Sequence, residues 1–151
     1  MKTMGAIVAL LTLTACAGVG PMNTPSGNPE VTIRSTNTSR IKNALVASYS
    51  ASGYSLVSDS QFNLVFTKQM SAGEAALYTV AMGNAYSSMP NIKVAFTIVP
   101  ESGATRVFAH VGAEMQGVFG QNQGMSLDHG KAGTQVQASL EQLKAEIESR
   151  G

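Results

Sequence analysis

The side chains that most often perform catalysis are few in this chain, and they do not group along the sequence. Its two histidines, His110 and His129, lack the i, i+4 spacing with which one helix face binds a metal ion. Asp128 directly precedes His129, so on paper the two form an acid–base pair. An aspartate just before a helical pattern is more typical of an N-cap, and we expect Asp128 to cap the C-terminal helix. The carboxylates of Glu30, Asp59, Glu74, Glu101 and Glu114 show no paired spacing for general acid–base catalysis.

The motifs of two further classes of enzyme are missing from the sequence. No serine stands in a Gly-x-Ser-x-Gly elbow. The glycine-rich stretch at residues 117–124 lacks the lysine and the Ser or Thr of a phosphate-binding loop. Charged residues make up 13% of the chain, the formal net charge is +1, and no basic stripe is present to neutralise phosphates. We therefore predict a protein that is not an enzyme, binds no nucleic acid and holds no metal or cofactor.

The one cysteine of the chain, Cys16, stands directly behind a short apolar stretch at residues 4–13. Lys2 and the amino terminus supply positive charge, and small residues precede the cysteine, so the parts of a secretory signal are present. The apolar stretch is shorter than the roughly 20 residues that span a bilayer, and we expect residues 1–15 to be removed. A single cysteine cannot form a disulfide within the chain, so burial of apolar surface must stabilise the fold.

The run Leu13-Thr14-Ala15-Cys16 resembles the lipobox of bacterial lipoproteins. The resemblance implies cleavage before Cys16 by signal peptidase II, a diacylglycerol on its sulfur and a third acyl chain on its amine. Ala17 follows, in place of the aspartate that tends to keep enteric lipoproteins in the inner membrane, which implies an outer-membrane protein facing the periplasm. Each buried methylene adds about 0.8 kcal/mol to membrane binding, so several chains make release very slow. The alternatives are an ordinary secreted protein with a cysteine near the cut by chance, or a cysteine in the core.

Residues 16–29 predict a lipidated N-terminus followed by a flexible tether. The tether contains three prolines and three glycines and has no apolar period. Extended at roughly 3 Å per residue, it lifts the domain about 35 to 40 Å from the membrane. The alternative is a loop packed on the domain. The remaining residues, 30–151, suit a single domain with a modest core.

Hydrophobic periodicity predicts the elements of this domain. Strand-like alternation occurs at residues 31–33, 54–58, 62–67, 92–98 and 107–115. Helical spacing runs from about residue 39 to residue 52, before Gly53 in the position of a C-cap glycine. It returns from residue 129 or 131 to residue 149. The sequence therefore predicts an α+β fold: an antiparallel sheet of about four to five strands, with an early helix and a long C-terminal helix packed on one face.

Two segments of ambiguous pattern carry the residues that we expect on a partner-binding surface. Residues 73–82 favour a short helix followed by a loop, although residues 77–82 also have strand propensity. Residues 116–127 favour a flexible loop rich in glycine and glutamine. Methionine and aromatic residues suit adaptable contact surfaces, and the candidates are Tyr78, Met82, Tyr86, Phe119 and Met125. The alternative is that these side chains pack into the core or into their own loops.

The order of the predicted elements resembles that of helix-grip domains, including those of a lipoprotein subunit of the outer-membrane β-barrel assembly machine. This resemblance is one of element order and anchor, and it carries no site residues across. We expect a non-enzymatic, lipid-anchored protein that binds or scaffolds an envelope protein in an assembly, secretion or conjugation apparatus. One alternative is a periplasmic binding module for an apolar or glycan ligand held between sheet and helix. Another is an enzyme on cell-wall or lipid substrates, which requires a cleft that gathers His110 or His129 with carboxylates.

The predicted anchor is tested by changing the cysteine. A Cys16→Ser variant has no thiol to acylate, so it is expected to move from the membrane to the soluble fraction, and mass analysis of the purified wild type is expected to show attached acyl chains. A Thr3→Ser variant, altered only within the predicted signal, is the control and should stay with the membrane. Native material that begins upstream of residue 16, or that carries no fatty acid, would contradict the prediction.

Overall fold

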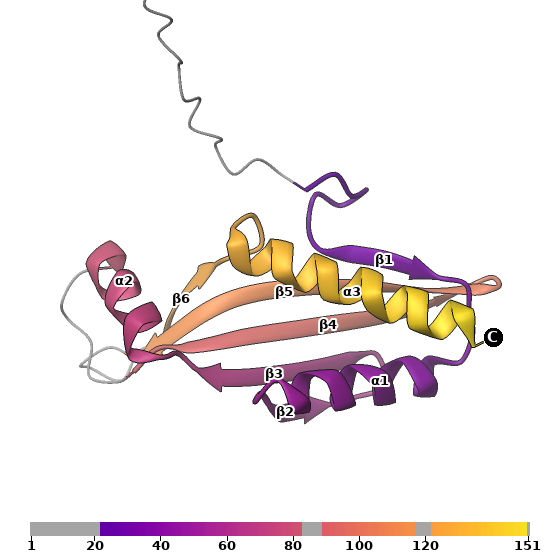
Figure 1. Cartoon of the computed structure of the whole chain (residues 1–151), viewed down its shortest axis with the longest axis horizontal. Coiled ribbons are helices and arrows are strands. Elements are labelled where there is room, and N and C mark those ends of the chain that lie inside the picture. The colour runs from indigo at the N-terminus through magenta and orange to yellow at the C-terminus, as the bar shows by residue number, and fades with distance from the viewer. Residues whose placement is uncertain (1–21, 83–88, 117–121, 151) are drawn as a thin grey trace, which may run out of the picture.

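The computed structural model describes residues 22–82, 89–116 and 122–150. They form an antiparallel six-stranded sheet with an early helix and a long C-terminal helix packed on one face (Figure 1). The predicted α+β fold is confirmed, with a sheet of six strands in place of the four or five expected. None of the described helices is long and apolar enough to cross a membrane.

Three helices follow groups of one, two and three strands along the described part of the chain. They are β1 (Glu30–Ile33), α1 (Thr38–Ala51), β2 (Ser55–Asp59), β3 (Asn63–Gln69), α2 (Ala72–Met82), β4 (Asn91–Glu101), β5 (Ala104–Gln116), β6 (Asn122–Ser126) and α3 (Lys131–Ser149). The strand order is β1-β5-β4-β3-β2, and β6 also pairs with β5. One edge of β5 is therefore shared, because β1 pairs with residues 105–108 and β6 with residues 112–116.

The core lies between the sheet and the two helices α1 and α3. Helix α1 buries Ile41, Leu45 and Tyr49 against the alternate residues of β3, β4 and β5 that face it. Helix α3 buries the apolar stripe expected from the sequence, which consists of Val136, Leu140, Leu143 and Ile147. The Tyr49 ring stacks on Phe66 at a centroid distance of 5.2 Å and meets Phe96 edge-on at 5.0 Å. Such pairs add to the burial of apolar area that stabilises the domain.

Of two local predictions from the sequence, one is confirmed and the other is wrong in part. The helix at residues 73–82 is confirmed, and the alternative strand is wrong. The flexible loop predicted at residues 116–127 is wrong for its second half, because Asn122–Ser126 is the strand β6. Polar residues and Gly124 give this strand no apolar alternation. Its conformation comes from pairing with β5, which no local pattern reveals.

The free tether predicted up to residue 29 is also wrong over its second part, because residues 22–29 form a turn that packs on the domain. The Thr24 hydroxyl donates to the carbonyl of Asn28, the amide of Gly27 donates to the carbonyl of Thr24, and Pro29 is fully buried. Gly27 has a φ of +75°, which residues with a side chain adopt rarely. Hydroxyl and glycine residues therefore build a turn from a composition that also suits a flexible linker. Residues 16–21 lie outside the described part of the chain.

The outer edge of β1 is covered by side chains of α3. The backbone N–H of Glu30 donates to Gln137 Oε1 at 2.8 Å, and Gln137 Nε2 donates to the carbonyl of Glu30 at 3.1 Å. The backbone N–H of Arg34 donates to Glu148 Oε1 at 2.8 Å. Because the backbone groups of an open edge strand attract other chains, these bonds protect β1 from edge-to-edge association.

The Glu30 carboxylate ties the N-terminal turn to the sheet. It accepts hydrogen bonds from the Ser26 amide and from the Arg106 guanidinium, whose Nη2 lies 2.7 Å from Oε1. Burial acts to raise the pKa of this carboxyl, but the bonds from Ser26 and Arg106 outweigh it and hold the pKa below its usual value.

The start of α3 requires a residue without a side chain at Gly133. A methyl group there would lie 1.7 Å from the carbonyl oxygen of Asp128, a backbone atom that cannot swing away. We expect Gly133→Ala to lower the free energy of unfolding by roughly 3 kcal/mol, at the upper end of overpacking costs, as measured by urea denaturation. Gly73→Ala in α2 is the matched control, because outside its own stretch of helix no described residue has an atom within 4 Å of the added methyl. It should leave stability unchanged or raise it by up to about 1 kcal/mol. A Gly133→Ala protein as stable as the wild type would contradict the packing described.

Candidate functional site

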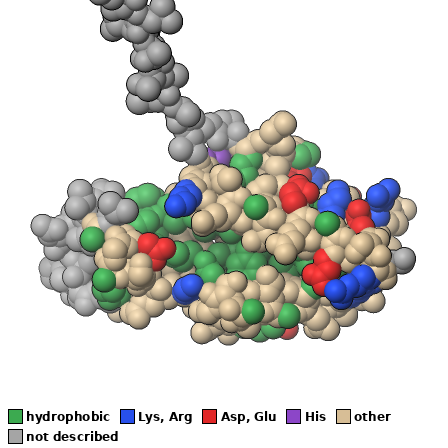
Figure 2. Space-filling model, in the orientation of Figure 1, with side chains coloured by type: hydrophobic (Ala, Val, Ile, Leu, Met, Phe, Trp, Pro, Cys, Tyr) green, Lys and Arg blue, Asp and Glu red, His purple; other side chains and the backbone are tan. Residues whose placement is uncertain are grey.

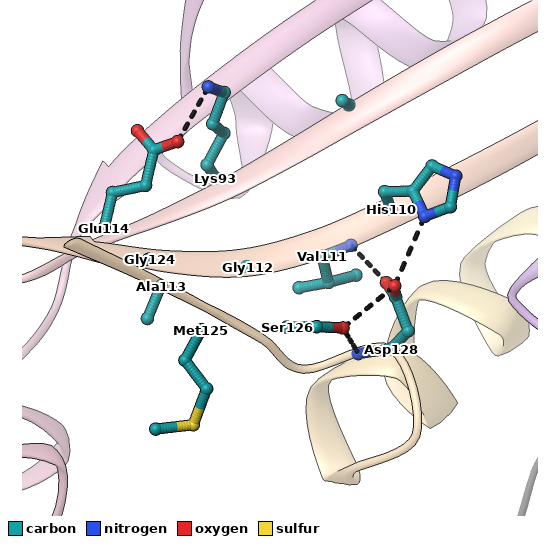
Figure 3. Close-up of a pocket in the computed structure, with 11 residues that line it drawn as sticks. Lys93, His110, Val111, Gly112, Ala113, Glu114, Gly124, Met125, Ser126 and Asp128 are labelled. Atoms are coloured by element: carbon teal, nitrogen blue, oxygen red, sulfur yellow. Dashed lines mark hydrogen bonds and ion pairs between the residues drawn. The ribbon is translucent and has the colours of Figure 1, made fainter. Parts of the chain in front are cut away.

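The face of the sheet opposite the helices carries a shallow hollow over β4, β5 and β6 (Figure 3). Its volume is about 360 Å³. The register explains its position: Ala95 stands opposite His110, Lys93 opposite Gly112, and Gly112 opposite Ser126. The small residues Ala95, Gly112 and Gly124 therefore form a diagonal floor across three strands. We call this hollow the trough.

One side of the trough is an ion pair between Lys93 on β4 and Glu114 on β5. The distance from Lys93 Nζ to Glu114 Oε1 is 2.8 Å, and both side chains are partly exposed. A pair in that position contributes at most about 1 kcal/mol to stability. Its charges also satisfy each other, so this side presents hydrogen-bonding groups without a net charge.

The other side is organised by the carboxylate of Asp128, which is almost fully buried (Figure 3). Its Oδ1 accepts a hydrogen bond from the backbone N–H of Val111 at 2.6 Å. Its Oδ2 accepts one from the Ser126 hydroxyl at 3.0 Å and lies 3.2 Å from His110 Nδ1. His110 itself is 61% exposed, so Asp128 holds one ring nitrogen while most of the imidazole remains in solvent.

This arrangement corrects the prediction that Asp128 caps the C-terminal helix. The N-cap of α3 is Gly130, and no side chain caps it. The carboxylate instead fills the gap that β1 and β6 leave on the edge of β5. The carbonyl of Pro29 accepts from the amide of Ala109 and β6 ends opposite Gly112, so the amide of Val111 lies between the two strands. A buried amide without an acceptor is costly, and Asp128 supplies one.

The polar cluster resembles the parts of a nucleophilic site, but its connections differ. In a Ser-His-Asp triad the serine bonds the histidine, whereas the Ser126 hydroxyl bonds the carboxylate of Asp128. In the structure Asp128 pairs with His110. The sequence had instead suggested a pair between Asp128 and its neighbour His129. No group of three or more His, Cys, Asp or Glu residues that could hold a metal ion occurs within the described residues.

A second concavity lies on the helix face, between the end of α1 and the start of α3. We call it the groove. Figure 2 shows hydrophobic side chains gathered in the hollow at the centre of this face. The groove has a volume of about 120 Å³, and its lining consists of Ser48, Tyr49, Ser52, Tyr54, Ile92, Val111, Ala132, Gln135, Val136 and Ser139. Burial raises the pKa of Tyr49 and of Tyr54, so both phenols stay protonated at neutral pH.

Two of the predicted partner-surface residues are described in full. Tyr78 on α2 packs against a second cluster of buried residues, which consists of Met70, Ala75 and Ala113. Its hydroxyl oxygen is buried, has no hydrogen-bond partner among the described residues, and its pKa is raised by burial. Met125 on β6 is half-buried and stands opposite Ala113. Tyr86, Phe119, Cys16 and the side chain of Met82 lie outside the described residues.

The topology brings the described flanks of the two segments predicted to carry the partner surface, residues 77–89 and 116–127 (the recognition segments), to the same end of the sheet. Strand β3 ends at Gln69, and β4 begins opposite it at Asn91. Strand β5 ends at Gln116, and β6 begins opposite it at Asn122. Helix α2 lies at this end as well (Figure 1), and we call it the α2 end. The exposed Met89, which is 43% accessible, lies two residues before the start of β4 at this end.

Comparison of the chain with models of protein families, with curated proteins and with solved structures gave no match. The resemblance to lipoproteins therefore stays a prediction that rests on the N-terminal sequence. The resemblance to helix-grip domains stays one of element order.

Removing the Asp128 carboxylate tests its role in the sheet. Asp128→Ala leaves the buried amide of Val111 without an acceptor, and we expect a loss of roughly 2–3 kcal/mol in the free energy of unfolding. Asp128→Asn keeps an oxygen that can accept from Val111 and should lose only about 1 kcal/mol. His110→Ala is the control and should cost less than about 1 kcal/mol, because its ring is mostly exposed. Urea denaturation measures all three, and an Asp128→Ala protein of wild-type stability would refute this role.

Proposed function

We propose that this chain is a non-enzymatic, lipid-anchored envelope protein that binds a protein partner with the α2 end of its domain. The observation that carries the proposal is the convergence of the described flanks of the two recognition segments at that end. They are far apart in sequence, and only the pairing of β3 with β4 and of β5 with β6 brings them together. The predicted lipobox at residues 13–16 supports the location, which is the periplasmic face of the outer membrane.

The surface chemistry at the α2 end supports protein binding. Tyr78, Met89 and Met125 lie there, and residues of these types are enriched at protein interfaces. Helix α2 spans eleven residues, of which Glu74 is the one charged residue. A weakly charged surface with aromatic and methionine side chains loses little on desolvation when a partner covers it.

The trough favours one alternative, the binding of a glycan. Its volume of about 360 Å³ falls within the range of small-ligand sites. Its polar sides and its floor of small residues present hydrogen-bonding groups beside a flat surface. The groove between sheet and helices does not support the ligand site first expected there, because about 120 Å³ is below that range. Saturable binding of cell-wall fragments, lost on Gly112→Leu, would favour this alternative over a protein partner.

The proposal is tested by recovering the tagged, full-length protein from envelope membranes in mild detergent, with mass spectrometry of what co-purifies. A protein partner is expected at a reproducible ratio to the tagged chain. Met89→Glu places a charge at the α2 end and is expected to reduce recovery at least tenfold, the effect of losing about 1.4 kcal/mol of binding. Val57→Glu is the matched control, because Val57 is 57% exposed but lies on β2, the edge strand of the sheet. Recovery of the wild type as a free monomer would count against the proposal, as would equal effects of the two substitutions.

A further inference from the structure

We infer that the partner protein adds an extended segment of its own to the outer edge of β6. This inference rests on the function proposed above and names the conformation and the chemistry that the partner must bring. Strand β6 begins at the α2 end, where Asn122 stands opposite Gln116, and it lies at the edge of the sheet (Figure 1).

The pairing of β6 with β5 fixes which of its backbone groups point outward. The amide of Leu127, just past the end of β6, donates to the carbonyl of Val111 at 2.8 Å. In an antiparallel pair every second residue turns its N–H and C=O toward the partner strand, so Met125 also faces β5. Gly124 and Ser126 therefore turn their N–H and C=O away from the sheet. No described residue forms a hydrogen bond with these groups of Gly124.

The other two outer strands are protected, whereas β6 is not. Side chains of α3 occupy backbone groups of β1, and a shift of register interrupts β2. Strand β6 pairs in a continuous register over five residues and contains neither a charged residue nor a proline. Among the described elements, β5 alone contacts it extensively. Charges, prolines and bulges are the usual means of blocking an edge, and an unblocked edge accepts a further strand through its backbone.

The trough selects the side chain that the added segment places on the open face of the sheet (Figure 3). Gly124 has no side chain, so a residue added opposite it lays its own side chain across β6 toward the trough. An aromatic ring suits this position, because it covers the exposed backbone of an edge glycine. The ring meets the Cγ methylene of Glu114, which lies 3.9 Å from where a side chain at Gly124 would begin. Lys93 neutralises the carboxylate of Glu114, so the ring needs no charge.

The other face of the added segment meets Met125. This side chain is half-buried and stands opposite Ala113, which belongs to the buried cluster with Met70 and Ala75. An apolar residue beside Met125 extends this apolar region and is removed from water. Because neighbours in a strand point to opposite faces, the segment has an aromatic residue and an apolar residue next to each other in its sequence.

A second copy of this chain is a poorer occupant than a segment of another protein. Two copies of β6 paired about a two-fold axis at Gly124 would place glycine opposite glycine and Met125 opposite Gln123. No ring would then cover Gly124, and Met125 is the one apolar side chain that each strand brings. Stable dimers bury a much larger surface. Residues 17–21 of the chain contain two glycines and a proline, a composition that disfavours a strand.

The first test removes one outward donor. Gly124→Pro deletes an N–H that makes no bond within the described domain and places the proline ring where the segment would approach. The added Cβ fits, because its nearest neighbour is the carbonyl oxygen of Ala113 at 3.5 Å. We expect an unchanged midpoint of unfolding in urea and at least about a tenfold loss of partner recovered from membranes in mild detergent. Thr32→Pro is the matched control, because its N–H also points outward, but from β1. It should leave recovery unchanged.

Hydrogen exchange of the wild-type protein keeps the inference testable if the proline variant does not fold. In the free protein the outward amides of Gly124 and Ser126 should exchange fast, and the amide of Met125, which faces β5, should be protected. With the recovered partner bound, exchange at Gly124 and Ser126 should slow by at least about tenfold. Mass spectrometry with fragmentation that resolves single residues measures all three amides.

A photoreactive phenylalanine analogue at Asn122 identifies the segment itself. The side chain of Asn122 shares the open face with the position of Gly124, so the adduct should form beside the added strand. We expect the cross-linked peptide to contain an aromatic residue with an apolar neighbour. A cross-linked peptide without an aromatic residue would overturn the role given to the trough.

The remaining outcomes distinguish this inference from the proposed function. A partner that Gly124→Pro retains in full, or outward amides that exchange equally fast in the complex, would overturn pairing at β6 and leave the proposed function standing. An adduct with a second copy of this chain, or with residues 17–21 of the same chain, would overturn the inference. Absence of any partner from the wild type would overturn both.

Discussion

Strand β5 is the element on which the rest of this structure depends. It pairs with β4 along one edge and shares its other edge between β1 and β6. Because β1 and β6 pair with different parts of the same edge of β5, the residues of β5 between them have no strand partner on that edge. A buried backbone amide there needs another acceptor. The carboxylate of Asp128 supplies it for Val111, and the backbone of the same residue lies close against Gly133 in α3. A single acidic residue thereby joins the last strand, the last helix and the centre of the sheet.

The outer strands β1 and β2 are protected from other chains by different means. Side-chain oxygens and an amide of α3 occupy the backbone groups of β1. Strand β2 is short, and its register with β3 shifts between Leu56 and Ser58, so it offers a poor template for a further strand. Pairing of another chain with β1 or with β2 is therefore disfavoured.

Much of the fold could be predicted because the elements that build the core carry strong periodic patterns. The alternation in β3, β4 and β5 and the stripe from Val136 to Ile147 follow directly from burial on one face. Strand β6 could not be predicted, because Asn122–Ser126 is polar and takes its conformation from β5. The role of Asp128 could not be predicted either, because it also depends on strand pairing. Its position before a helix suggests a cap, whereas its acceptor function depends on where β1 and β6 stop along β5. The trough and the groove depend on register and on helix placement, which hydrophobic periodicity does not specify.

The turn at residues 22–29 sets how far the domain can stand from a bilayer if Cys16 carries lipid. The turn begins six residues after the cysteine, at residue 22. At about 3.5 Å per residue or less, the intervening chain has a maximum length of about 20 Å. That is about half the reach of a chain free up to residue 29. The domain would then be confined to a thin layer at the membrane surface and would not reach the full depth of the periplasm. Within so thin a layer even a weak interface becomes well occupied, because confinement raises the effective concentration of anything held at the same height.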